Sequence, residues 1–554
     1  MYLRKNLHVM FLLPMGVLGS LVFAQTPPNA GSLLRQISPP TTQQTPNATG
    51  VVAPVQVSPA QPLDQGLVFS VRQIHITGST IFSEAELLPL VSDMLNAERS
   101  LAQLQDAAAR ITARYRAAGY LVARAYLPQQ KIENGLVSIA VLEGKLADIK
   151  IENASHLSTA RAQAMLGEID LSKPVNQRQI NRAVLLLGNT PGVGAVDARL
   201  SPGGNVGETV LTTRLNPVPY ASGRFELDNY GGLYTGRNRV GASVDVSSPF
   251  GFGERFSARL IASDSDLLYG RLAAQAPVGS SGLTVGTAIG RSTYALGDTF
   301  AALDAVGRST TSELFARYPL LRGVDANVYA QAAWEQRKLR DEVRSTATTT
   351  DKHAQVGTLS LQADARDGWG GGGSTQGSVA LSQGRLGIDS PDAAALDAAG
   401  AQSVGRYTKW AWAVQRQQGL GVGWSLGAQV RGQRAGQNLD SSEKLSLGGA
   451  NGVRAYASGE ATGDKGWLAS LELRYAISPQ VSASVFYDAG QVTVNAKPYL
   501  ASPNTLRRSG TGMGLAGSYG AFDWQAAMAW RGGDAGTAEP DRQTRFWVQA
   551  GWRF

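Results

Sequence analysis

The last ten residues of the chain, "RFWVQAGWRF" at positions 545–554, alternate apolar and polar side chains. On a strand, one face would be apolar and rich in aromatic residues: Phe546, Val548, Ala550, Trp552 and Phe554. The other face would carry Arg545, Gln549 and Arg553. A period of two indicates a β-strand, and aromatic residues near the ends of the apolar face are typical of strands that cross a membrane.

The same alternation continues back to about residue 220. It is clear in "SGRFELDNY" (222–230), "NRVGASVDV" (238–246) and "FDWQAAMAW" (522–530). About sixteen such segments occur, an even number that suits a bacterial barrel with an aqueous lumen. They start near residues 223, 238, 254, 267, 283, 312, 326, 355, 375, 407, 423, 467, 481, 510, 522 and 545. We therefore expect residues 220–554 to form an all-β transmembrane barrel of antiparallel strands, without a helix.

A large soluble β-sandwich would show the same period, with its apolar faces turned inward. The N-terminus favours the membrane. Residues 1–24 have a basic start, an apolar stretch with Pro14, and a Val22-Phe23-Ala24 cleavage pattern, so they are expected to be a signal peptide that directs export. A membrane anchor is the alternative interpretation. Residues 25–66 read as a Pro- and Gln-rich linker, interrupted by a short apolar island at about 29–37 that would put Leu33, Leu34 and Ile37 on one side of a helix.

Residues 67–145 and 146–219 read as two α+β modules with the same order of elements, β-α-α-β-β. In the first, "FSVRQIHITG" (69–78) alternates as a strand and Ser83 can cap a helix through Glu86. A second helix over about 100–118 would end at Gly119. Neither module contains a catalytic pair or a phosphate loop.

The composition argues against an enzyme. The chain has no cysteine, its four histidines are not at metal-ligand spacing, and it contains no HExxH or GxSxG motif. Two GxGxxG strings, at 368–373 and 512–517, fall in a turn and in a strand and do not open a helix. The acids Asp389, Asp392 and Asp397 are expected in a solvated loop. The net charge is +8 without a Lys/Arg-rich run, which disfavours a nucleic-acid partner. We expect no catalytic residues, cofactor or metal site.

A long Gly-rich loop at about 434–466 carries "LGGANGVRAY" at 447–456. The later segment "VSASVFYDAGQV" (481–492) would turn Asp488 into the lumen, because Asp488 alternates with the apolar Tyr487. If the loop folds inside the barrel, Arg454 could meet Asp488 as an arginine–carboxylate latch. The alternative is that Arg454 lies in a surface loop in contact with water.

Several motifs, in order, resemble one family. "GVRAY" (452–456) and "FYDAG" (486–490) are similar to the paired loop and strand signature of the POTRA-plus-barrel superfamily, with Ala455 where that signature has glycine. Residues 114–146 resemble the first POTRA domain of two-partner secretion outer-membrane transporters, the haemolysin secretion/activation family (TpsB; ShlB, FhaC and HecB type). "LDNYGGLYTGRNRVG" (227–241) resembles the start of their barrel, and "AGSLLRQI" (30–37) resembles their plug helix.

The resemblance implies that Arg454 and Asp488 join the lumen-folded loop to the wall, and that Phe554 is the terminal aromatic residue used in membrane insertion. It implies further members of the latch, namely Val453, Tyr456, Phe486 and Gly490. It implies an outer-membrane location in a Gram-negative bacterium, with POTRA 1 (67–145) and POTRA 2 (146–219) in the periplasm.

The implied activity is export of a large secreted partner through the barrel, without nucleotide hydrolysis and with no cofactor. The partner would be of the haemolysin, adhesin or contact-dependent toxin type, bound by the POTRA modules through its N-terminal secretion domain. The other implied partners are outer-membrane lipid and, during biogenesis, the barrel-assembly machinery. An outer-membrane assembly factor of the same superfamily is the alternative, followed by a diffusion porin, an adhesin or a soluble β-rich protein; the modules at 67–219 argue against a porin.

Overall fold

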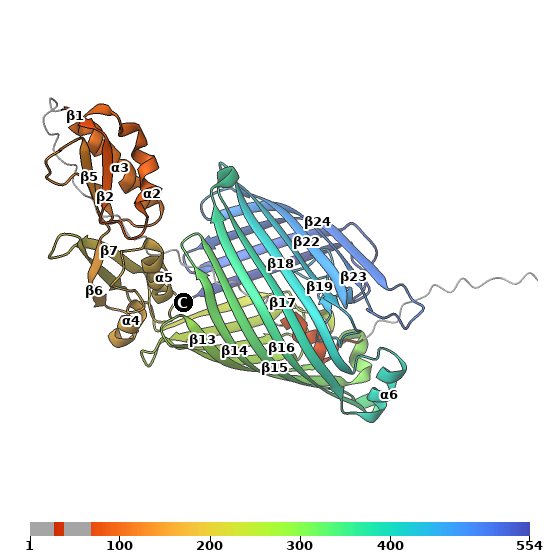
Figure 1. Cartoon of the computed structure of the whole chain (residues 1–554). Helices are drawn as coiled ribbons and strands as arrows, with labels where there is room; N and C mark the ends of the chain where they lie inside the picture. The colour runs from red at the N-terminus through yellow and green to blue at the C-terminus, as the bar shows by residue number, and fades with distance from the viewer. Residues whose placement is uncertain (1–26, 38–67) are drawn as a thin grey trace, which may run out of the picture.

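The computed structural model describes residues 27–37 and 68–554. The predicted signal peptide (1–24) and most of the predicted linker (38–66) lie outside the described residues. Two small α+β modules stand at one end of a large barrel (Figure 1).

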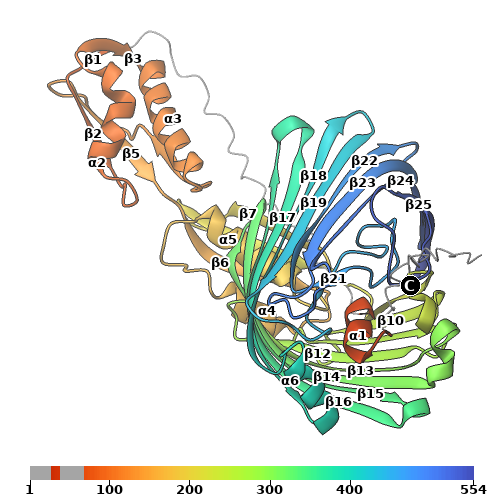
Figure 2. The same ribbon diagram turned by 90° about the vertical axis from the view of Figure 1, so that its right-hand side faces the viewer.

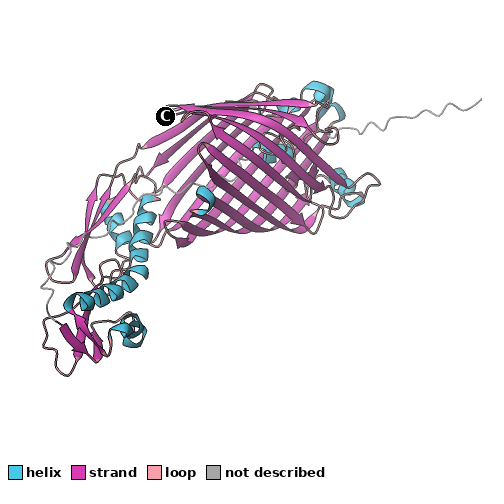
Figure 3. Ribbon diagram, turned by 90° about the horizontal axis from the view of Figure 1, so that it is seen from above, coloured by secondary structure: helices cyan, strands magenta, loops and turns pink. Residues whose placement is uncertain are grey.

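Sixteen antiparallel strands close the barrel, as the alternation predicts. They are β9 (Ala221–Asp228), β10 (Arg239–Ser247), β11 (Arg255–Ser263), β12 (Leu268–Val278), β13 (Leu283–Ala295), β14 (Ala305–Arg322), β15 (Ala326–Val343), β16 (Thr348–Asp367), β17 (Gly373–Ile388), β18 (Gly405–Gly421), β19 (Trp424–Ala435), β22 (Lys465–Ala476), β23 (Val481–Thr493), β24 (Thr505–Tyr519), β25 (Phe522–Arg531) and β26 (Thr544–Arg553). Each pairs with the next, and β26 pairs with β9 to close the cylinder. The strands of the two walls cross at a steep tilt (Figure 3).

The two faces of each strand have the predicted character. Phe225 and Leu227 of β9 are more than half exposed on the outer surface, where lipid would cover them. The intervening Glu226 faces inward and accepts a hydrogen bond from Arg259 of β11. The apolar faces are therefore outside, which is the arrangement of a membrane barrel and the reverse of a soluble sandwich.

One α-helix contradicts the expectation of a region without helices after residue 220, and four short 3₁₀ helices lie in other connections: η2 (Leu233–Thr235), η3 (Asp298–Leu303), η4 (Arg344–Thr346) and η5 (Trp369–Gly371). Residues Pro391–Ala399 form the helix α6 in the loop between β17 and β18. Proline is favourable in the first turn of a helix, and alanine has the highest helix propensity. The segment lacks an apolar stripe, and Leu396 is 75% exposed, so no helical period marked it in the sequence. The acids Asp392 and Asp397 accordingly lie on this helix.

The first module contains β1 (Val68–Val71), β2 (Gln73–Thr77), α2 (Glu84–Leu87), a short 3₁₀ helix η1 (Leu88–Met94), β3 (Ala97–Ser100), α3 (Leu101–Ala117), β4 (Arg124–Tyr126) and β5 (Leu136–Leu142). The helix α3 begins at a capping box of Ser100 and Gln103, and Gly119 follows its end with φ 94°. Its buried face, which includes Ile111 and Tyr115, packs on the sheet β2-β5-β4. The pairing of β1 with β3 was not predicted.

The second module contains β6 (Lys145–Asn153), α4 (Thr159–Leu166), α5 (Gln177–Gly188), β7 (Val196–Pro202) and β8 (Glu208–Leu215). Its sheet has the order β6-β8-β7, and its core is separate from that of the first module.

Within the described ranges, no helix is both long and apolar enough to span a membrane.

Arginines bind the second module to the turns at the near end of the barrel. Arg161 donates to the carbonyls of Pro277 and Gly279 at 3.0 and 2.8 Å. Arg322 of β14 donates to the side chain of Asn189, which follows α5, at 3.1 Å. These turns therefore lie at the end of the barrel that the resemblance places in the periplasm, here called the periplasmic end. The loop that carries α6 lies at the opposite end, here called the extracellular end (Figure 1).

Candidate functional site

The barrel lumen is occupied by two segments that are distant in sequence. One is the helix α1 (Ala30–Ile37), and the other is the connection between β19 and β22, residues 436–464, here called the lumen loop. Figure 2 shows α1 inside the barrel, beside the folded loop. The loop contains a small ladder of β20 (Leu445–Ser446) with β21 (Thr462–Gly463).

The lumen loop packs against the wall formed by β22, β23 and β25. Val453 and Tyr456 of the loop are at most 2% exposed, and Phe486 and Ala529 are among the wall residues in the same apolar cluster. Gly490 lies directly under the loop, because a Cβ at this position would come within 2.7 Å of a methyl carbon of Leu447. A larger residue at position 490 would lift the loop from the wall.

Arg454 lies at the tip of the loop and contacts the wall through its whole guanidinium group. Its Nε and Nη2 each donate to a different oxygen of Asp488 at 2.8 Å, and Nη1 donates to Glu472 at 2.8 Å. The group also stacks over Phe486, 3.2 Å from the ring centroid. The indole of Trp547 on β26 donates to the backbone carbonyl of Arg454 at 2.6 Å. The structure thus brings together the residues expected from the sequence and adds Glu472 and Trp547.

Ala455 stands where the loop signature of the superfamily has glycine. Its φ angle is not positive, so the backbone at this position is not strained by a side chain. Its side chain faces Gly510 of β24, where an added Cβ would come within 2.5 Å of the Ala455 Cβ. The methyl group of Ala455 therefore occupies the space that Gly510 leaves free.

A second buried ion pair, which the sequence did not indicate, lies behind the tip. Arg508 of β24 donates to Glu460 of the loop at 2.6 Å, and both side chains are at most 2% exposed. Glu460 also accepts the backbone N–H groups of Thr537 and Ala538 at 2.8 and 2.7 Å. The carboxylate therefore ties the loop to the β25–β26 connection. The sequence did not indicate this pair, because Glu460 is a single charged residue in a Gly-rich loop and no motif connects it with Arg508.

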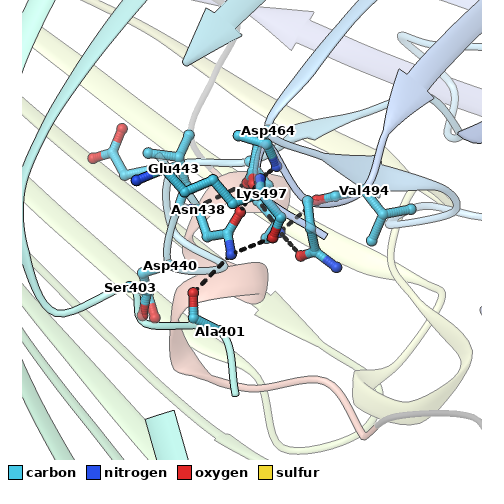
Figure 4. A network of polar contacts seen from close by, with 12 residues as sticks. Ala401, Ser403, Asn438, Asp440, Glu443, Asp464, Val494 and Lys497 are labelled. Atoms are coloured by element: carbon cyan, nitrogen blue, oxygen red, sulfur yellow. Dashed lines mark hydrogen bonds and ion pairs between the residues drawn. The ribbon is translucent and has the colours of Figure 1, made fainter. Parts of the chain in front are cut away.

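The base of the lumen loop is tied to neighbouring extracellular loops (Figure 4). Asp464, fully buried, accepts from the N–H groups of Leu439 and Ala496 and pairs with Lys444 at 2.9 Å. Asn438 donates to the carbonyls of Ala401 and Lys497 at 2.7 and 2.9 Å, and so joins three loops. The loop is therefore held at its base, behind its tip and at the tip itself.

Between base and tip, Glu443 of the lumen loop reaches the opposite part of the wall. It accepts hydrogen bonds from Arg337 of β15 and Lys409 of β18, and the Glu443 and Lys409 side chains are at most 8% exposed. Beside it, Asp440 accepts from Lys352 of β16 at 2.7 Å. The loop thus crosses the lumen and bridges two walls.

The helix α1 is placed by an apolar face and by its N-terminus. Leu33, Leu34 and Ile37 pack on a set of wall and loop residues, here called the plug socket, at the extracellular half of the barrel. The main members of the socket are Tyr234, Ile261, Leu267, Tyr269, Tyr294, Leu296, Ala305 and Leu339. The N–H of Ala30 donates to Asp341 at 2.7 Å, and Ser441 of the lumen loop donates to Asn29 at 2.7 Å.

The terminal residue Phe554 lies at the seam of the barrel. Its ring is 58% exposed and stacks on Phe225 with centroids 5.4 Å apart, and its backbone exchanges hydrogen bonds with Gly223 of β9.

Among the described residues there is no group of three or more side chains that could hold a metal ion.

Comparisons with known proteins agree with this architecture. The family of "Haemolysin secretion/activation protein ShlB/FhaC/HecB" matches residues 207–517, more than half of the chain, and the ShlB-type POTRA domain matches residues 69–144. The chain is 27% identical over 486 residues to the heme/hemopexin transporter protein HuxB of Haemophilus influenzae, covering 86% of this chain and 85% of HuxB. It is 25% identical over 425 residues to the outer membrane transporter CdiB of Dickeya dadantii, covering 74% and 73% of the two chains.

Solved structures share the fold. CdiB from Escherichia coli superposes with a TM-score of 0.73 at 20% identity, covering 91% of this chain and 94% of CdiB. CdiB from Acinetobacter baumannii gives a TM-score of 0.65 at 16% identity, covering 94% and 96%. The match of the family over most of the barrel, together with the POTRA match, shows that the chain belongs to the haemolysin secretion/activation protein family (ShlB/FhaC/HecB) and is a two-partner secretion transporter of the outer membrane, which exports a partner protein.

Proposed function

We propose that the partner is a large exoprotein of the haemolysin, adhesin or contact-dependent toxin type, recognised through its N-terminal secretion domain and exported unfolded through the barrel. The observation that carries this proposal is the occupied lumen. Both α1 and the lumen loop are held by side-chain contacts that can break, so the barrel is closed at rest and can open. Export needs no nucleotide if folding of the exoprotein outside the cell makes its return unfavourable.

Recognition is assigned to the edges of the POTRA sheets. The order β2-β5-β4 leaves β2 and β4 at the edges of the first sheet, and the order β6-β8-β7 leaves β6 and β7 at the edges of the second. An extended segment can add to such an edge through backbone hydrogen bonds. Glu84 already accepts the N–H of Ile76 on β2, whereas β6 offers nine residues, so the second sheet supplies the longer edge.

The latch between Arg454 and Asp488 is assigned to holding the lumen loop in place while α1 leaves. The loop has four further attachments, at Asp440, Glu443, Glu460 and Asp464. The helix α1 has an apolar contact, two hydrogen bonds near its N-terminus and the attraction of Arg35 to Glu443 of the loop. Departure of α1 therefore costs fewer polar contacts than departure of the loop. Phe554 is assigned, as part of the same proposal, to recognition by the barrel-assembly machinery during insertion.

A barrel-assembly factor remains the second candidate within the superfamily. BamA from Haemophilus ducreyi shares the fold at a TM-score of 0.50 and 14% identity, which carries no functional argument. The presence of α1 in the lumen favours a channel that must be closed at rest, and hence secretion.

The test is to sequence the DNA on both sides of the gene and to co-express the transporter with any long reading frame found there that begins with a signal peptide. The exoprotein is expected in the medium when the transporter is present and in the periplasm when it is absent. Recovery of an equal amount in the medium without the transporter would overturn the proposal, as would a general defect in outer-membrane protein content when the gene is deleted. The second result would instead support the assembly factor.

A further inference from the structure

The outer surface of the barrel carries basic side chains near its extracellular end, on the strands β13 to β19. They face outward, because each lies at an even spacing from an exposed apolar residue of its own strand, such as Trp334 on β15 and Trp410 on β18. All six are exposed, and in the described part of the protein none of them forms a hydrogen bond or ion pair. We call them the cation belt: Arg291, Arg308, Lys338, Arg385, Arg406 and Arg434.

On four strands the belt lies at one fixed distance beyond the apolar band. The cation is four residues from an outward apolar residue, towards the extracellular end, which is about 13 Å along a strand. The four pairs are Trp334 with Lys338, Leu381 with Arg385, Trp410 with Arg406, and Val430 with Arg434. The outward position between them is uncharged: Gln336, Gln383, Thr408 or Gly432. The belt therefore lies at the level where lipid chains give way to headgroups.

Direct cross-strand neighbours in this region repel one another. Arg385 of β17 lies opposite Arg406 of β18, and Arg308 of β14 lies opposite Arg340 of β15. Like charges at directly opposed positions destabilise a sheet. An anion from outside the chain that lies between such a pair would remove the repulsion.

The nearby carboxylates of the protein are already bonded to other groups. Three carboxylates on the same face have partners outside the belt: Asp351 with Arg340, Asp389 with His353, and Glu342 with Arg344. The periplasmic end of β18 differs, because the outward Arg416 pairs there with Asp367 at 2.8 Å. A cation on the outer face is thus neutralised by the protein at one end of the strand, whereas Arg406 at the other end is not.

A groove of about 580 Å³ lies in the apolar band beside the belt. The exposed side chains of Leu314, Trp334 and Leu359 border it, and the small residues Ala332 and Gly357 leave space between them. Its lining continues through two residues of β17, Leu381 and Gln383, the second of which is two positions before Arg385. A hydrocarbon chain in the groove would therefore have its polar end next to the belt.

We propose that the cation belt and the groove bind a phosphorylated lipid of the outer leaflet, with a phosphate between Arg385 and Arg406 and an acyl chain in the groove. Lipopolysaccharide has this chemistry, since its lipid A portion carries phosphates on a sugar headgroup above several acyl chains. Guanidinium groups bind phosphate oxygens through paired N–H donors, and clusters of basic residues bind anionic lipid headgroups. The site depends on the outer-membrane location and not on which exoprotein is exported.

The first test is native mass spectrometry of the full-length transporter, purified in a mild detergent and mixed with lipid A that carries both phosphates. The parent is expected to retain lipid A, and Arg385→Gln/Arg406→Gln should lower the bound fraction at least tenfold. The matched control is Lys465→Gln/Arg507→Gln, which removes two outward cations at the extracellular ends of β22 and β24 that do not oppose each other. The control should bind as the parent does, and equal losses in the two double variants would overturn the proposal.

Two further probes, applied to the parent, separate the lipid from a simple anion. Lipid A without phosphates is expected to bind at least tenfold less than the phosphorylated form. Inorganic phosphate in large molar excess should leave lipid A bound, because it lacks the acyl chain. Equal binding of the two forms of lipid A, or its displacement by inorganic phosphate, would refute a site for a phosphorylated lipid.

A second test fills the groove without touching a charge. In Gly357→Leu, a Cβ meets only the carbonyl oxygen of Gln383, at 3.9 Å, so the strands can still pair. We expect the bound fraction of lipid A to fall at least fivefold. Gly377→Leu is the matched control, because it lies on the outer face of β17 opposite Val414, outside the groove, and its Cβ meets only the carbonyl oxygen of Ala413, at 3.9 Å. Parent-like binding by Gly357→Leu would show that no acyl chain occupies the groove.

Discussion

The guanidinium group of Arg454 joins the lumen loop to the wall through four side-chain hydrogen bonds, to Asp488 twice, to Glu472 and to Ser470. Asp488 is 1% exposed, so its charge has little access to water. Removing one partner of a buried pair leaves the other charge unpaired, which costs about 3–5 kcal/mol. The planar fork of arginine fits this geometry, and the single ammonium of lysine does not.

We expect Arg454→Ala to release the tip of the loop. Exoprotein secretion should fall at least tenfold, and the resting conductance in planar bilayers should change. Arg454→Lys should recover only part of the activity, because lysine cannot make the bidentate contact. The matched control is Arg474→Ala, which removes a half-exposed arginine that pairs with Glu472 on the same wall. Wild-type secretion and conductance in Arg454→Ala would show that the latch is dispensable.

Glu143 and Tyr115 make the first POTRA module sensitive to pH at both extremes. Burial acts to raise the pKa of the Glu143 carboxyl, but hydrogen bonds from Thr80, Ile81 and Tyr115 outweigh it and hold that pKa below its usual range. Burial raises the pKa of Tyr115 to about 12. Stability from Glu143 is therefore lost as pH falls below its ordinary value of about 4.3, and stability from Tyr115 is lost as pH rises from about 10 to 12.

We therefore expect the helices of the module to melt at lower temperature between pH 10 and 12, measured by far-ultraviolet circular dichroism of the full chain. In Tyr115→Phe, most of this alkaline decrease should disappear, at a cost of about 1 kcal/mol at neutral pH for the lost hydrogen bond. Tyr126→Phe, at an exposed position on β4, is the control and should keep the alkaline decrease. An unchanged alkaline profile in Tyr115→Phe would assign the effect to another group.

At the scale of the element, α1 lies against both the barrel wall and the lumen loop. The close approach of its first turn to the lumen loop requires a residue without a side chain. A Cβ at Gly31 would lie 2.4 Å from the hydroxyl of Ser441 and 2.9 Å from the N–H of Ser442. Any larger residue must push the helix and the loop apart.

We expect Gly31→Val to raise the resting conductance of the channel severalfold while the barrel still assembles, because the helix can no longer sit against the loop. Gly436→Val, in the lumen loop, is the control, since a Cβ there meets nothing within 4 Å. Single-channel recording in planar bilayers gives the comparison. Equal conductance of the two variants would mean that α1 tolerates displacement at its first turn.

The elements differ in how far the sequence predicted them. Each barrel strand was predicted because lipid outside and water inside impose alternation on every residue, as in "RFWVQAGWRF". The helix α6 was missed because it buries no side chain against the rest of the protein and therefore needs no apolar stripe. Contacts within the lumen depend on which loop meets which wall. Arg454 and Asp488 were suggested by the inward parity of Asp488 and by resemblance, which also gave the other latch residues and the apolar face of α1. Glu443 and Glu460 were missed because they pair with residues more than thirty positions away that no local pattern connects.

At the scale of the whole molecule, the second α+β module and the barrel form one docked unit. The N–H of Ser158 donates to the carbonyl of Gly251 in the β10–β11 turn at 2.9 Å, beside the arginine contacts to the other periplasmic turns. Export must then proceed without separation of this module from the barrel mouth.

A disulfide tests this directly. A Cβ at Gly251 would lie 3.6 Å from that of Ser158, within the range of native disulfides. We expect Ser158→Cys/Gly251→Cys to cross-link on oxidation and to secrete as much exoprotein oxidised as reduced. The single variant Gly251→Cys controls for the left-handed backbone at this position, where φ is 80°. Loss of secretion on oxidation, restored by reductant, would show that the module must move.

The plug socket has a further consequence for the cell envelope. If α1 leaves the lumen during export, as proposed, Tyr234, Tyr294 and Leu339 lose an apolar cover and face water, which is unfavourable in proportion to the area exposed. Because α1 stays covalently attached to the barrel, its effective concentration at the vacated surface remains high. Once the last segment of an exoprotein has left, hydrophobic recapture of the helix should be spontaneous. The transporter would then restore the permeability barrier by itself, and a bacterium that exports very long chains need not admit bile salts or antibiotics between rounds.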